Sequence, residues 1–599
     1  MHCTRLLPWA LALSALLAGC DDSAEPVAAD GAPPELALDA SPRPDQASNV
    51  TPDGGPDAQL DAEVHSSDLG LPPLPAPEAP PACGETVALS TALPGLAAPG
   101  HDAELAAKAH RIDRLWRAIS AFGTGGNADV GVVDRAARDA VQAFADGDGW
   151  AFEGDLGALT GSFGKVTGLY AGAGIVADAH RYRALRDGGA DCAEVERARA
   201  HLRTGLEVLA RVVRITGTPG VIARAIARRD LPGQGQVEVT PLFDADGAPL
   251  PEEKNNGTWR ADNGGQDPDW IWEDSCSRDM YLGWAWAFAA AWEAVAHDPD
   301  FTDAEKQALR EAATALLDGL RAVQDSGYDL EIRDADGRRT YHGILNENSV
   351  DRVYVDGAPN GFNAFMAVGI VAALAHVSQA PWQQAWLADD LVAVRGLLQM
   401  ARDSMIGLDL GVGSNYSGYN MAFTAGWLAV RYLPDAADRA LAADVVQAAI
   451  YQRPDAERQP VEQSQALYHL VAHMAAAGHS AFGPGAGGSA PLAATVAVLR
   501  DYPAAPLWDD PRENCDAAEL EAGVCEAVDG TQVEVHPSTG RGGTIVSRGP
   551  LPIHLRPPSN YYWRSNPYQL NGGGDGLTLL PAVDFRAIYW AARDLRVEP

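Results

Sequence analysis

The chain has 599 residues, of which 46% are hydrophobic and 21% charged, and its formal net charge is −36 at pH 7. An acidic surface of this strength repels phosphate backbones and anionic head groups, which excludes nucleic acid as a partner bound through the overall field. Only local arginine pockets could bring an acidic ligand to such a protein. The hydrophobic fraction is ample for a large buried core.

The first twenty residues predict export. Arg5 precedes a short apolar run that ends in Leu17-Ala18-Gly19-Cys20. The run is too short to span a bilayer and is typical of a secretory signal. Its end resembles a bacterial lipobox, which implies that residues 1–19 are removed and that Cys20 carries lipid, anchoring the protein in the cell envelope at the outer membrane or the periplasmic face. The alternative is an ordinary signal peptide that is cut elsewhere.

Residues 20–82 predict a disordered tether. From Asp21 to Ala82 there are thirteen acidic residues against one basic residue, Arg43, a net charge of −12. A segment with so little apolar surface cannot offset its ordering entropy, and its Pro-rich end adds semi-rigid spacing. We expect it to hold the folded body, residues 83–599, away from a membrane surface.

Helical periodicity dominates this body. It predicts helices at 102–121, 132–146, 163–187, 193–215, 219–228, 278–297, 302–324, 360–378, 384–405, 418–433, 436–451, 462–477, 490–501 and 582–594. Helices that are apolar on all sides, such as 282–296, alternate with helices charged on one face, which predicts inner and outer helices. Strand-like segments at 532–537, 544–547 and 552–555 predict a small β excursion near the C-terminus.

We therefore expect an all-α fold, a toroid of about six helical hairpins. Long exported chains of antiparallel helices with Trp-rich inner helices resemble the (α/α) toroid superfamily, which includes many glycoside hydrolases and polysaccharide lyases. The resemblance covers roughly residues 100–599 and is architectural only. No catalytic residue is carried over from it.

An exported chain permits disulfides. Cys515 and Cys525 lie in one polar loop and form the first predicted pair, and Cys83 with Cys192 is a second, weaker prediction. Cys276 would then be a free thiol. The cysteine spacing matches no zinc pattern, so we expect no metal and no cofactor.

Segment 255–281 is the densest cluster of residues that could carry chemistry. Its candidate substrate-binding residues are Trp259, Trp270, Trp272, Arg278 and Tyr281, and its candidate catalytic carboxylates are Asp274 and Asp279. Indole faces stack on sugar C–H surfaces, and carboxylates bind hydroxyls. The alternative is a loop that folds over the core, with Ser275 or Ser277 capping the next helix.

Two further clusters each precede an apolar helix. In the first, Glu347 is a candidate general acid, and Asn346 and Asn348 could hold sugar hydroxyls. In the second, Tyr416 is a candidate base, with Asn415 and Tyr419 beside it. A hydrogen-bonded surface loop and a Gly-rich turn are the respective alternatives.

Segment 560–576 is a fourth cluster, in which Asn571 and Asp575 are candidate binding residues beside glycines. A glycine-rich turn beside packed aromatics is the alternative. His469 and His473 lie four residues apart on one helix, but the Glu of a metalloprotease motif is replaced by Leu470. The Asp-x-Asp-Gly segments at 244–247 and 334–337 favour turns over calcium loops.

These features together predict an envelope-anchored, monomeric, carbohydrate-active enzyme. Hydrolysis would use Asp274 or Asp279 with Glu347. β-Elimination would use Tyr416 as base, with Asn346 or Asn415 and Arg278 around a uronate. The rivals are a non-catalytic surface glycan-binding lipoprotein and a structural lipoprotein. The enzyme hypothesis requires the polar loops to converge at one rim of the helical body.

Overall fold

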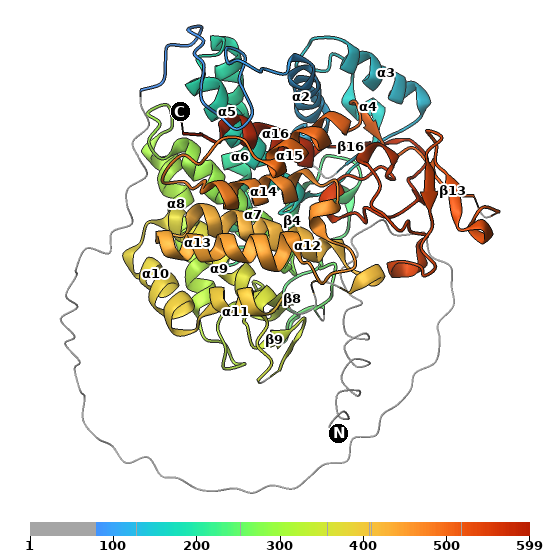
Figure 1. The fold of residues 1–599 in the computed structure, drawn as a ribbon. Coiled ribbons are helices and arrows are strands. Elements are labelled where there is room, and N and C mark those ends of the chain that lie inside the picture. The colour runs from blue at the N-terminus through green and yellow to red at the C-terminus, as the bar shows by residue number, and fades with distance from the viewer. Residues whose placement is uncertain are drawn as a thin grey trace, which may run out of the picture. The chain divides into compact units, whose positions relative to one another are not determined.

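The computed structural model describes residues 79–598, except 127–128, 252, 356, 406–407, 409 and 517. The predicted signal peptide 1–19, the lipidation site Cys20 and residues 20–78 of the predicted tether lie outside the described residues. The helical body follows from residue 83 onward (Figure 1).

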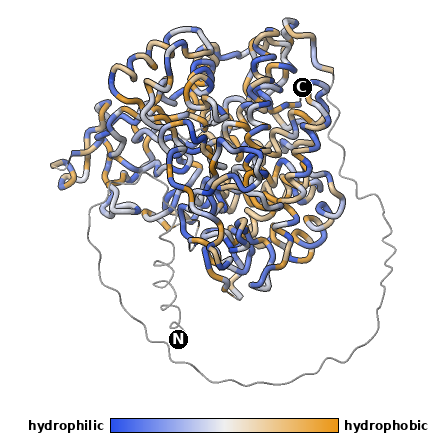
Figure 2. Tube along the Cα trace, turned by 180° about the vertical axis from the view of Figure 1, so that it is seen from behind, coloured by the Kyte–Doolittle hydropathy of each residue, from blue (hydrophilic) through white to orange (hydrophobic). Residues whose placement is uncertain are grey.

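Six of the described helices are buried on nearly all sides, and we call them the inner helices. They are α5 (Tyr170–Asp187), α7 (Arg278–Val295), α9 (Gly361–Ser378), α12 (Tyr416–Tyr432), α14 (Ala466–Ala477) and α16 (Val583–Asp594). Their sequences are rich in Ala, Val, Leu and aromatic residues on every face, so burial on every side is the stable arrangement. Figure 2 shows apolar residues concentrated along the central helices. Among the described helices, α9 has the length and composition to cross a membrane, but all of it is buried in the protein, as in a core helix.

In chain order each inner helix packs against the next, and α16 packs against α5, so the series closes. Helices α5 and α7 approach so closely that a Cβ atom on Gly283 would lie 2.1 Å from the carbonyl oxygen of Gly168. Only glycine allows this distance between backbones. The paired positions, Gly168 beside Gly283 and Gly172 beside Gly283, bring the N-terminal parts of the two helices together.

The remaining long helices pack outside this series with one apolar face inward. They are α2 (Ala103–Leu115) with η1 (Trp116–Ser120), α6 (Cys192–Arg214), α8 (Asp303–Arg321), α10 (Pro381–Ala385) with η3 (Trp386–Val394) and α11 (Leu397–Asp403), α13 (Ala436–Asp444) with η5 (Val445–Gln452), and α15 (Ala490–Asp501). Two shorter helices, α3 (Arg135–Asp146) and α4 (Leu156–Leu159), lie between α2 and α5 in sequence. Helix α8 begins with a capping box in which Thr302 and Glu305 bond each other's backbone N–H groups.

The predicted all-α fold class is wrong. The protein is 47% helical and 12% strand, with several small antiparallel sheets rather than one β excursion at the C-terminus. One four-stranded sheet has the order β11 (Leu507–Trp508), β16 (Thr578–Leu580), β1 (Val130–Val132), β2 (Thr160–Phe163). The other has the order β3 (Val166–Thr167), β4 (Ala225–Arg228), β6 (Trp270–Glu273), β5 (Trp259–Ala261).

Four two-stranded sheets complete the β structure of the described residues. They pair β7 (Glu331–Arg333) with β8 (Arg339–Ile344), β9 (Ser349–Val350) with β10 (Val353–Tyr354), β12 (Arg512–Glu513) with β15 (Asn571–Gly572), and β13 (Val524–Glu526) with β14 (Gln532–Glu534). The predicted helix 219–228 contains β4 instead, and the predicted strand 552–555 contains the short helix η9 (Ile553–Leu555). Strand β4 is central in its sheet and mostly buried, so its sequence lacks the alternation that marks a half-exposed strand.

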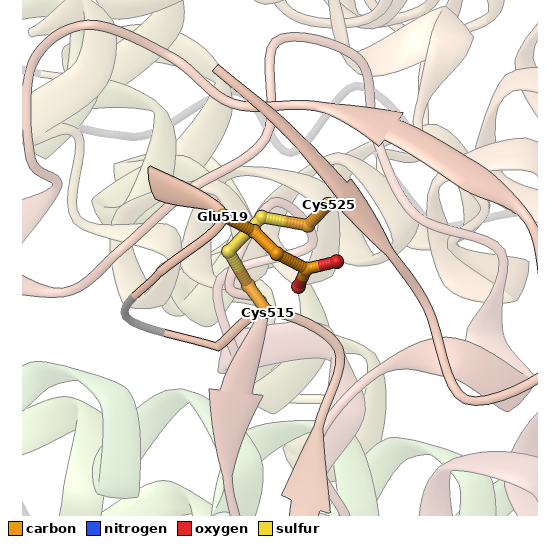
Figure 3. A group of neighbouring side chains, drawn as sticks. All are labelled: Cys515, Glu519 and Cys525. Carbon is orange, nitrogen blue, oxygen red and sulfur yellow. A yellow bond between two sulfur atoms is a disulfide. The ribbon is translucent and has the colours of Figure 1, made fainter. Parts of the chain in front are cut away.

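Both proposed cysteine pairs are disulfides in the structure, Cys83–Cys192 and Cys515–Cys525, and Cys276 is free and buried. The Glu519 carboxylate lies beside the second disulfide (Figure 3). It accepts hydrogen bonds from the backbone N–H groups of Asp516 and Glu526, at 3.1 and 3.2 Å, which fastens this loop. Sulfurs joined in a disulfide are not thiolate ligands, so the group has a structural role rather than metal-binding capacity.

Candidate functional site

The N-terminal ends of the inner helices gather at one place. Between α7 and α9, Arg278 donates a hydrogen bond from Nη1 to the Asn363 Oδ1 atom at 2.9 Å. Between α12 and α14, the rings of Tyr419 and Tyr468 lie 6.4 Å apart. These contacts place the start of α7 beside that of α9, and the start of α12 beside that of α14.

Segment 559–568, which we call the mouth segment, joins the other helix starts to them. Arg564 donates from Nη1 to the Tyr170 hydroxyl of α5 at 2.9 Å and from Nε to the Ser417 Oγ atom of α12 at 3.2 Å. The backbone N–H of Tyr562 donates to the Asp584 carboxylate of α16 at 2.9 Å. The mouth segment is therefore bound to the starts of three inner helices at once.

Asp279 lies in the first turn of α7 and is only half-buried. Its Oδ1 atom accepts a 2.5 Å hydrogen bond from the Ser277 hydroxyl, which itself accepts one from Arg224 at 2.8 Å. Burial by itself would raise the pKa of the Asp279 carboxyl, but the Arg224 and Arg564 guanidiniums and the Ser277 hydrogen bond hold that pKa below its ordinary value. Asp279 is thus a carboxylate at neutral pH, as a general base or nucleophile must be.

Asp129 has the opposite electrostatic environment. Burial raises the pKa of this carboxyl, repulsion from Asp509 adds to the rise, and the Asn560 hydrogen bond and the Lys165 ammonium only partly oppose it. A carboxyl group with a raised pKa can hold a proton at higher pH and donate it to a leaving group. Asp129 thus has the character of a general acid.

Two chains of contacts and electrostatic interactions connect Asp129 with Asp279, with Lys165 acting on Asp129 and Arg564 on Asp279 through their charges. On one side, Lys165 pairs with Glu273 at 2.9 Å, and Glu273 lies 3.6 Å from Arg224, which binds Ser277. We call the whole set the ring. It consists of Asp129, Asp279, the groups on this side, and Tyr170 with the mouth segment on the other side.

On the other side, Asn560 bonds Asp129, and its neighbour Tyr561 packs against Tyr170 with ring centroids 5.4 Å apart. Tyr170 in turn accepts the hydrogen bond from Arg564. Two carboxyl groups with opposite pKa shifts therefore belong to one connected set of polar and aromatic side chains.

Backbone strain is found in three of the segments that lead into inner helices. Of the six described non-glycine residues with positive φ, Ser275, Asp351 and Ala582, at 59°, 51° and 53°, precede α7, α9 and α16. The other three, among them Gln379 at the C-terminal end of α9, lie elsewhere. Left-handed backbone at non-glycine residues costs of order 1–3 kcal/mol and clusters at functional sites.

A second polar pair adjoins Arg278. The Asp351 carboxylate contacts the Nδ1 atom of His342 at 2.9 Å and accepts a hydrogen bond from Arg278 at 3.1 Å. Burial would raise the pKa of Asp351, but the His342 hydrogen bond and the Arg278 charge lower it. The pair holds Arg278 in place at the start of α7.

Glu347, the predicted general acid, is not in contact with the ring. It forms a salt bridge with Arg395, whose Nε atom lies 3.0 Å from its Oε1 atom at the end of η3. Asn346 donates to Asp329 at 3.0 Å, and Asn348 donates to Asn346 at 3.1 Å. These three predicted residues fasten the loop before α9 to an outer helix, as the hydrogen-bonded alternative expects.

Asp274 and the predicted tryptophans also have structural contacts. The Asp274 carboxylate accepts hydrogen bonds from Arg260 at 2.7 Å and from the Thr258 N–H at 2.6 Å. The Trp272 indole is fully buried and donates to Asn263 at 2.9 Å. Arg211 lies 4.2 Å above the Trp270 ring, which is 8% exposed. Two of the three tryptophans are therefore buried side chains of β6 rather than free for a sugar.

The other predicted residues divide between the site and the scaffold. Trp259 is half-buried on β5, and Tyr281 is buried inside α7, where its hydroxyl donates to the Leu316 carbonyl at 3.4 Å. Asn415 caps α12, and Tyr416 and Tyr419 lie buried at the start of that helix with rings 5.9 Å apart. Asn571 accepts from the Asn514 N–H at 2.9 Å beside β12 and β15, and the exposed Asp575 caps its own turn.

Possible metal ligands also have protein partners. Glu253, Asp274 and Asp334 bring carboxylate oxygens within 4.8 Å of one another. Burial, with repulsion from Glu253 and Asp274, raises the pKa of Asp334 well above its ordinary value, so a shared proton relieves the cluster. His469 contacts Tyr451, and His473 contacts His479 at 3.2 Å, so the two histidines do not form a common site.

Sequence reasoning missed five residues of the ring: Asp129, Lys165, Tyr170, Arg224 and Arg564. Arg564 lies in the aromatic segment that the sequence singled out, so its signal was visible. Asp129 follows the glycine pair Gly125-Gly126 and gives no periodic signal of its own. Its role depends on partners such as Asp509 and Asn560, which lie 380 and 431 residues away in the chain.

Comparison of the chain with known protein families, with curated proteins and with solved structures found no match. The resemblance to toroidal glycoside hydrolases and lyases therefore has no support from a relative. The function must be argued from the chemistry of the ring.

Proposed function

We propose that this protein is a carbohydrate-active enzyme that hydrolyses a glycosidic bond, with Asp129 as general acid and Asp279 as general base or nucleophile. The observation that carries the proposal is the pair of opposite pKa shifts within one connected ring. Glycoside hydrolysis uses such a pair, because one carboxyl group protonates the leaving oxygen while the other activates water or attacks the sugar. Environments that separate two pKa values assign the two roles.

Two aromatic pairs lie at the ring. Tyr170 of α5 packs against Tyr561, and Tyr416 of α12 packs against Tyr568, with all four side chains at most 6% exposed. Like Trp270 and Trp272, they are packed within the protein, so they hold the mouth segment in place rather than offer a free face to a sugar.

β-Elimination is the second candidate reaction. Arg564 donates a hydrogen bond to the Tyr170 hydroxyl at 2.9 Å, which holds that oxygen in place at the ring. Tyr170 would then be the base, in place of the Tyr416 that the sequence suggested, and Arg278 and Arg564 would neutralise a uronate. A non-catalytic glycan-binding protein is the rival outside enzymology.

We also propose that the protein is lipid-anchored through Cys20 in the bacterial cell envelope and acts as a monomer. The lipobox-like sequence and the acidic segment after it support this assignment. Labelling with a radioactive fatty acid tests it, since a Cys20→Ser variant should lose both the label and the membrane association.

The proposed activity is tested with the body from residue 79 onward, supplied with neutral and acidic oligosaccharides. Reducing ends report hydrolysis, and ultraviolet absorbance of an unsaturated product reports elimination. Asp129→Asn and Asp279→Asn should each lower kcat by about 10²–10⁴-fold. Asp435→Asn, at an exposed carboxylate that caps α13, is the matched control and should retain full activity.

Three results would contradict the proposal. Binding without turnover by the unaltered protein would establish the glycan-binding rival. Full activity in both Asp variants would exclude the ring as the catalytic site. An unsaturated product that depends on Tyr170 would replace hydrolysis with elimination.

A further inference from the structure

Two arginines near the starts of α12 and α14 are buried without a counter-ion. Arg458 is 3% exposed and Arg556 is 1% exposed. Among the described residues, no carboxylate lies within 4.0 Å of either guanidinium. Arg458 donates to the Ser547 carbonyl at 3.3 Å, and Arg556 donates to the Leu551 carbonyl at 3.0 and 2.9 Å. The Nη1 atom of each is enclosed and has no hydrogen-bond partner.

All but one of the other buried arginines of the described chain have carboxylate partners; Arg586, for example, binds Asp113 at 2.6 Å. The exception, Arg114, donates from all three of its guanidinium nitrogens to backbone carbonyls. Taking a charge out of water costs several kcal/mol unless an opposite charge and hydrogen bonds compensate it. Arg458 and Arg556 have neither a carboxylate nor a carbonyl for every nitrogen, so a missing anion is the simplest account of them.

Tyrosines surround both guanidiniums. Arg458 lies 3.9 Å above the Tyr568 ring, and Tyr568 lies 6.3 Å from Tyr416. Burial lowers the pKa of Arg556 to about 10, and the groups that act on it are tyrosines, among them Tyr468 and Tyr568. A guanidinium with a pKa of about 10 is still charged at neutral pH. The positive charge of Arg556 is therefore present when a ligand arrives.

Buried amide oxygens lie at the starts of the same two helices, from Asn420 in α12 and from Gln463 and Gln465 just before α14. Gln463, Gln465 and Asn420 are each at most 2% exposed, and each has a buried side-chain oxygen without a hydrogen-bond partner. Unpaired acceptors of this kind are rare in folded proteins, and sugar hydroxyl groups are their natural donors. Gln465 also donates to the Tyr562 carbonyl at 3.2 Å, which connects this cluster to the mouth segment.

We infer that Arg458 and Arg556 bind the anionic group of an acidic sugar, a carboxylate or a sulfate ester, while Gln463, Gln465 and Asn420 accept its hydroxyl hydrogen bonds. The inference rests on the proposed function for its substrate and adds the substrate class. Tyr416 precedes Ser417, the residue that Arg564 binds, so the subsite adjoins the ring along α12. In a protein with a net charge of −36, a paired local cation site is what an acidic glycan requires.

The test measures the binding of four monosaccharides by calorimetry. Binding is allowed to reach equilibrium, because the enclosed Nη1 atoms of Arg458 and Arg556 must become accessible before a ligand can reach them. The probes are D-glucuronate, glucose 6-sulfate and, as neutral partners, methyl glucoside and glucose. Arg458→Gln and Arg556→Gln keep a donor for the Ser547 and Leu551 carbonyls and remove the charge. Arg548→Gln removes an exposed arginine of the same region and is the matched control.

The unaltered protein and the control should bind an anionic probe at least about tenfold more tightly than its neutral partner, and each charge-removing variant should lose about tenfold or more of that affinity. Preference between glucuronate and glucose 6-sulfate identifies the anion. In anion-free buffer the variants should melt at or above the temperature of the unaltered protein, because an uncompensated buried charge is gone.

Equal affinity for charged and neutral probes would overturn the inference. Undiminished anion binding in a variant that melts at a lower temperature would also overturn it, since the arginine would then have a structural role. If one variant fails to fold, the other variant and the probe comparison decide. Binding of monosaccharides needs no turnover, so a cleavage assay that fails beside arginine-dependent anion binding overturns the proposed function alone. Cleavage of neutral glycans with no effect of either arginine overturns this inference alone.

Discussion

Glu293→Gln should destabilise the end of the inner helices that lies opposite the ring. Glu293, near the C-terminal end of α7, is buried and accepts hydrogen bonds from Arg431 at 2.7 and 2.6 Å, from Tyr432 at 2.5 Å and from Arg183 at 2.6 Å. The amide removes the charge that neutralises the buried Arg431 guanidinium and that shares the partly buried Arg183 guanidinium with Asp594. Removing one partner of a buried ion pair costs about 3–5 kcal/mol.

This free energy translates into a modest change in Tm because the body is large. At about 2.1 cal/mol/K per residue, unfolding of roughly 520 residues has an entropy of about 1.1 kcal/mol/K. A loss of about 4 kcal/mol therefore lowers Tm by about 4 °C. Circular dichroism melts of the body at pH 7 measure it, with Glu311→Gln on the exposed face of α8 as the control.

The pH dependence supplies a second readout. Burial alone would raise the pKa of Glu293, but Arg431 and Arg183 hold that pKa well below its ordinary value. Its stabilising contribution is complete above the unfolded-state pKa, about 4.3, and is lost as the pH falls toward the folded-state pKa. The Tm difference should shrink on acidification below about pH 4. A variant within 1 °C of the unaltered protein at pH 7, on the scale of about 4 °C above, would refute this account of the buried network.

Two further predictions concern other parts of the fold. Glu253→Gln removes one of the carboxylates whose repulsion raises the pKa of Asp334. A group with a raised folded-state pKa destabilises the protein as the pH rises, so the variant should gain about 1–3 °C in Tm at pH 7 and lose this gain near pH 4. An equal gain at both pH values would contradict this prediction. Gly168→Ala would place a Cβ atom 2.0 Å from the Met280 carbonyl oxygen and should lower Tm by several °C. Gly413→Ala serves as the control, because a Cβ atom there would meet nothing within 4 Å. Similar melts for both variants would show that α5 and α7 tolerate separation.

The helices were predictable because their signal is local and repeated. Segments such as 278–297 and 360–378 are long and apolar on every face, and they became α7 and α9. The strands were not predictable because most contain two to four residues. So short a segment offers no alternation to read, and β4 exists because β3 and β6 pair with it from distant parts of the chain.

For the site, sequence identified polar aromatic segments but could not tell scaffold from chemistry. Trp272 and Asp279 lie seven residues apart in the same segment. Trp272 is buried on β6 with its indole N–H bonded, whereas Asp279 is half-buried among arginines. The difference is decided by partners such as Arg564, nearly 300 residues away, and residue type alone carries no information about them.

The two ends of the inner helices differ in how their buried charges are balanced. At the C-terminal ends, Glu293 neutralises Arg183 and Arg431, and Asp594 contacts His180 at 2.8 Å, so buried groups have opposite partners. At the N-terminal ends, Arg458 and Arg556 lack carboxylates. Stability alone would favour full pairing at both ends, because the same helices contribute to each. The imbalance at one end, where the strained segments and the half-buried Asp279 also lie, therefore argues for a ligand there rather than for a purely structural role.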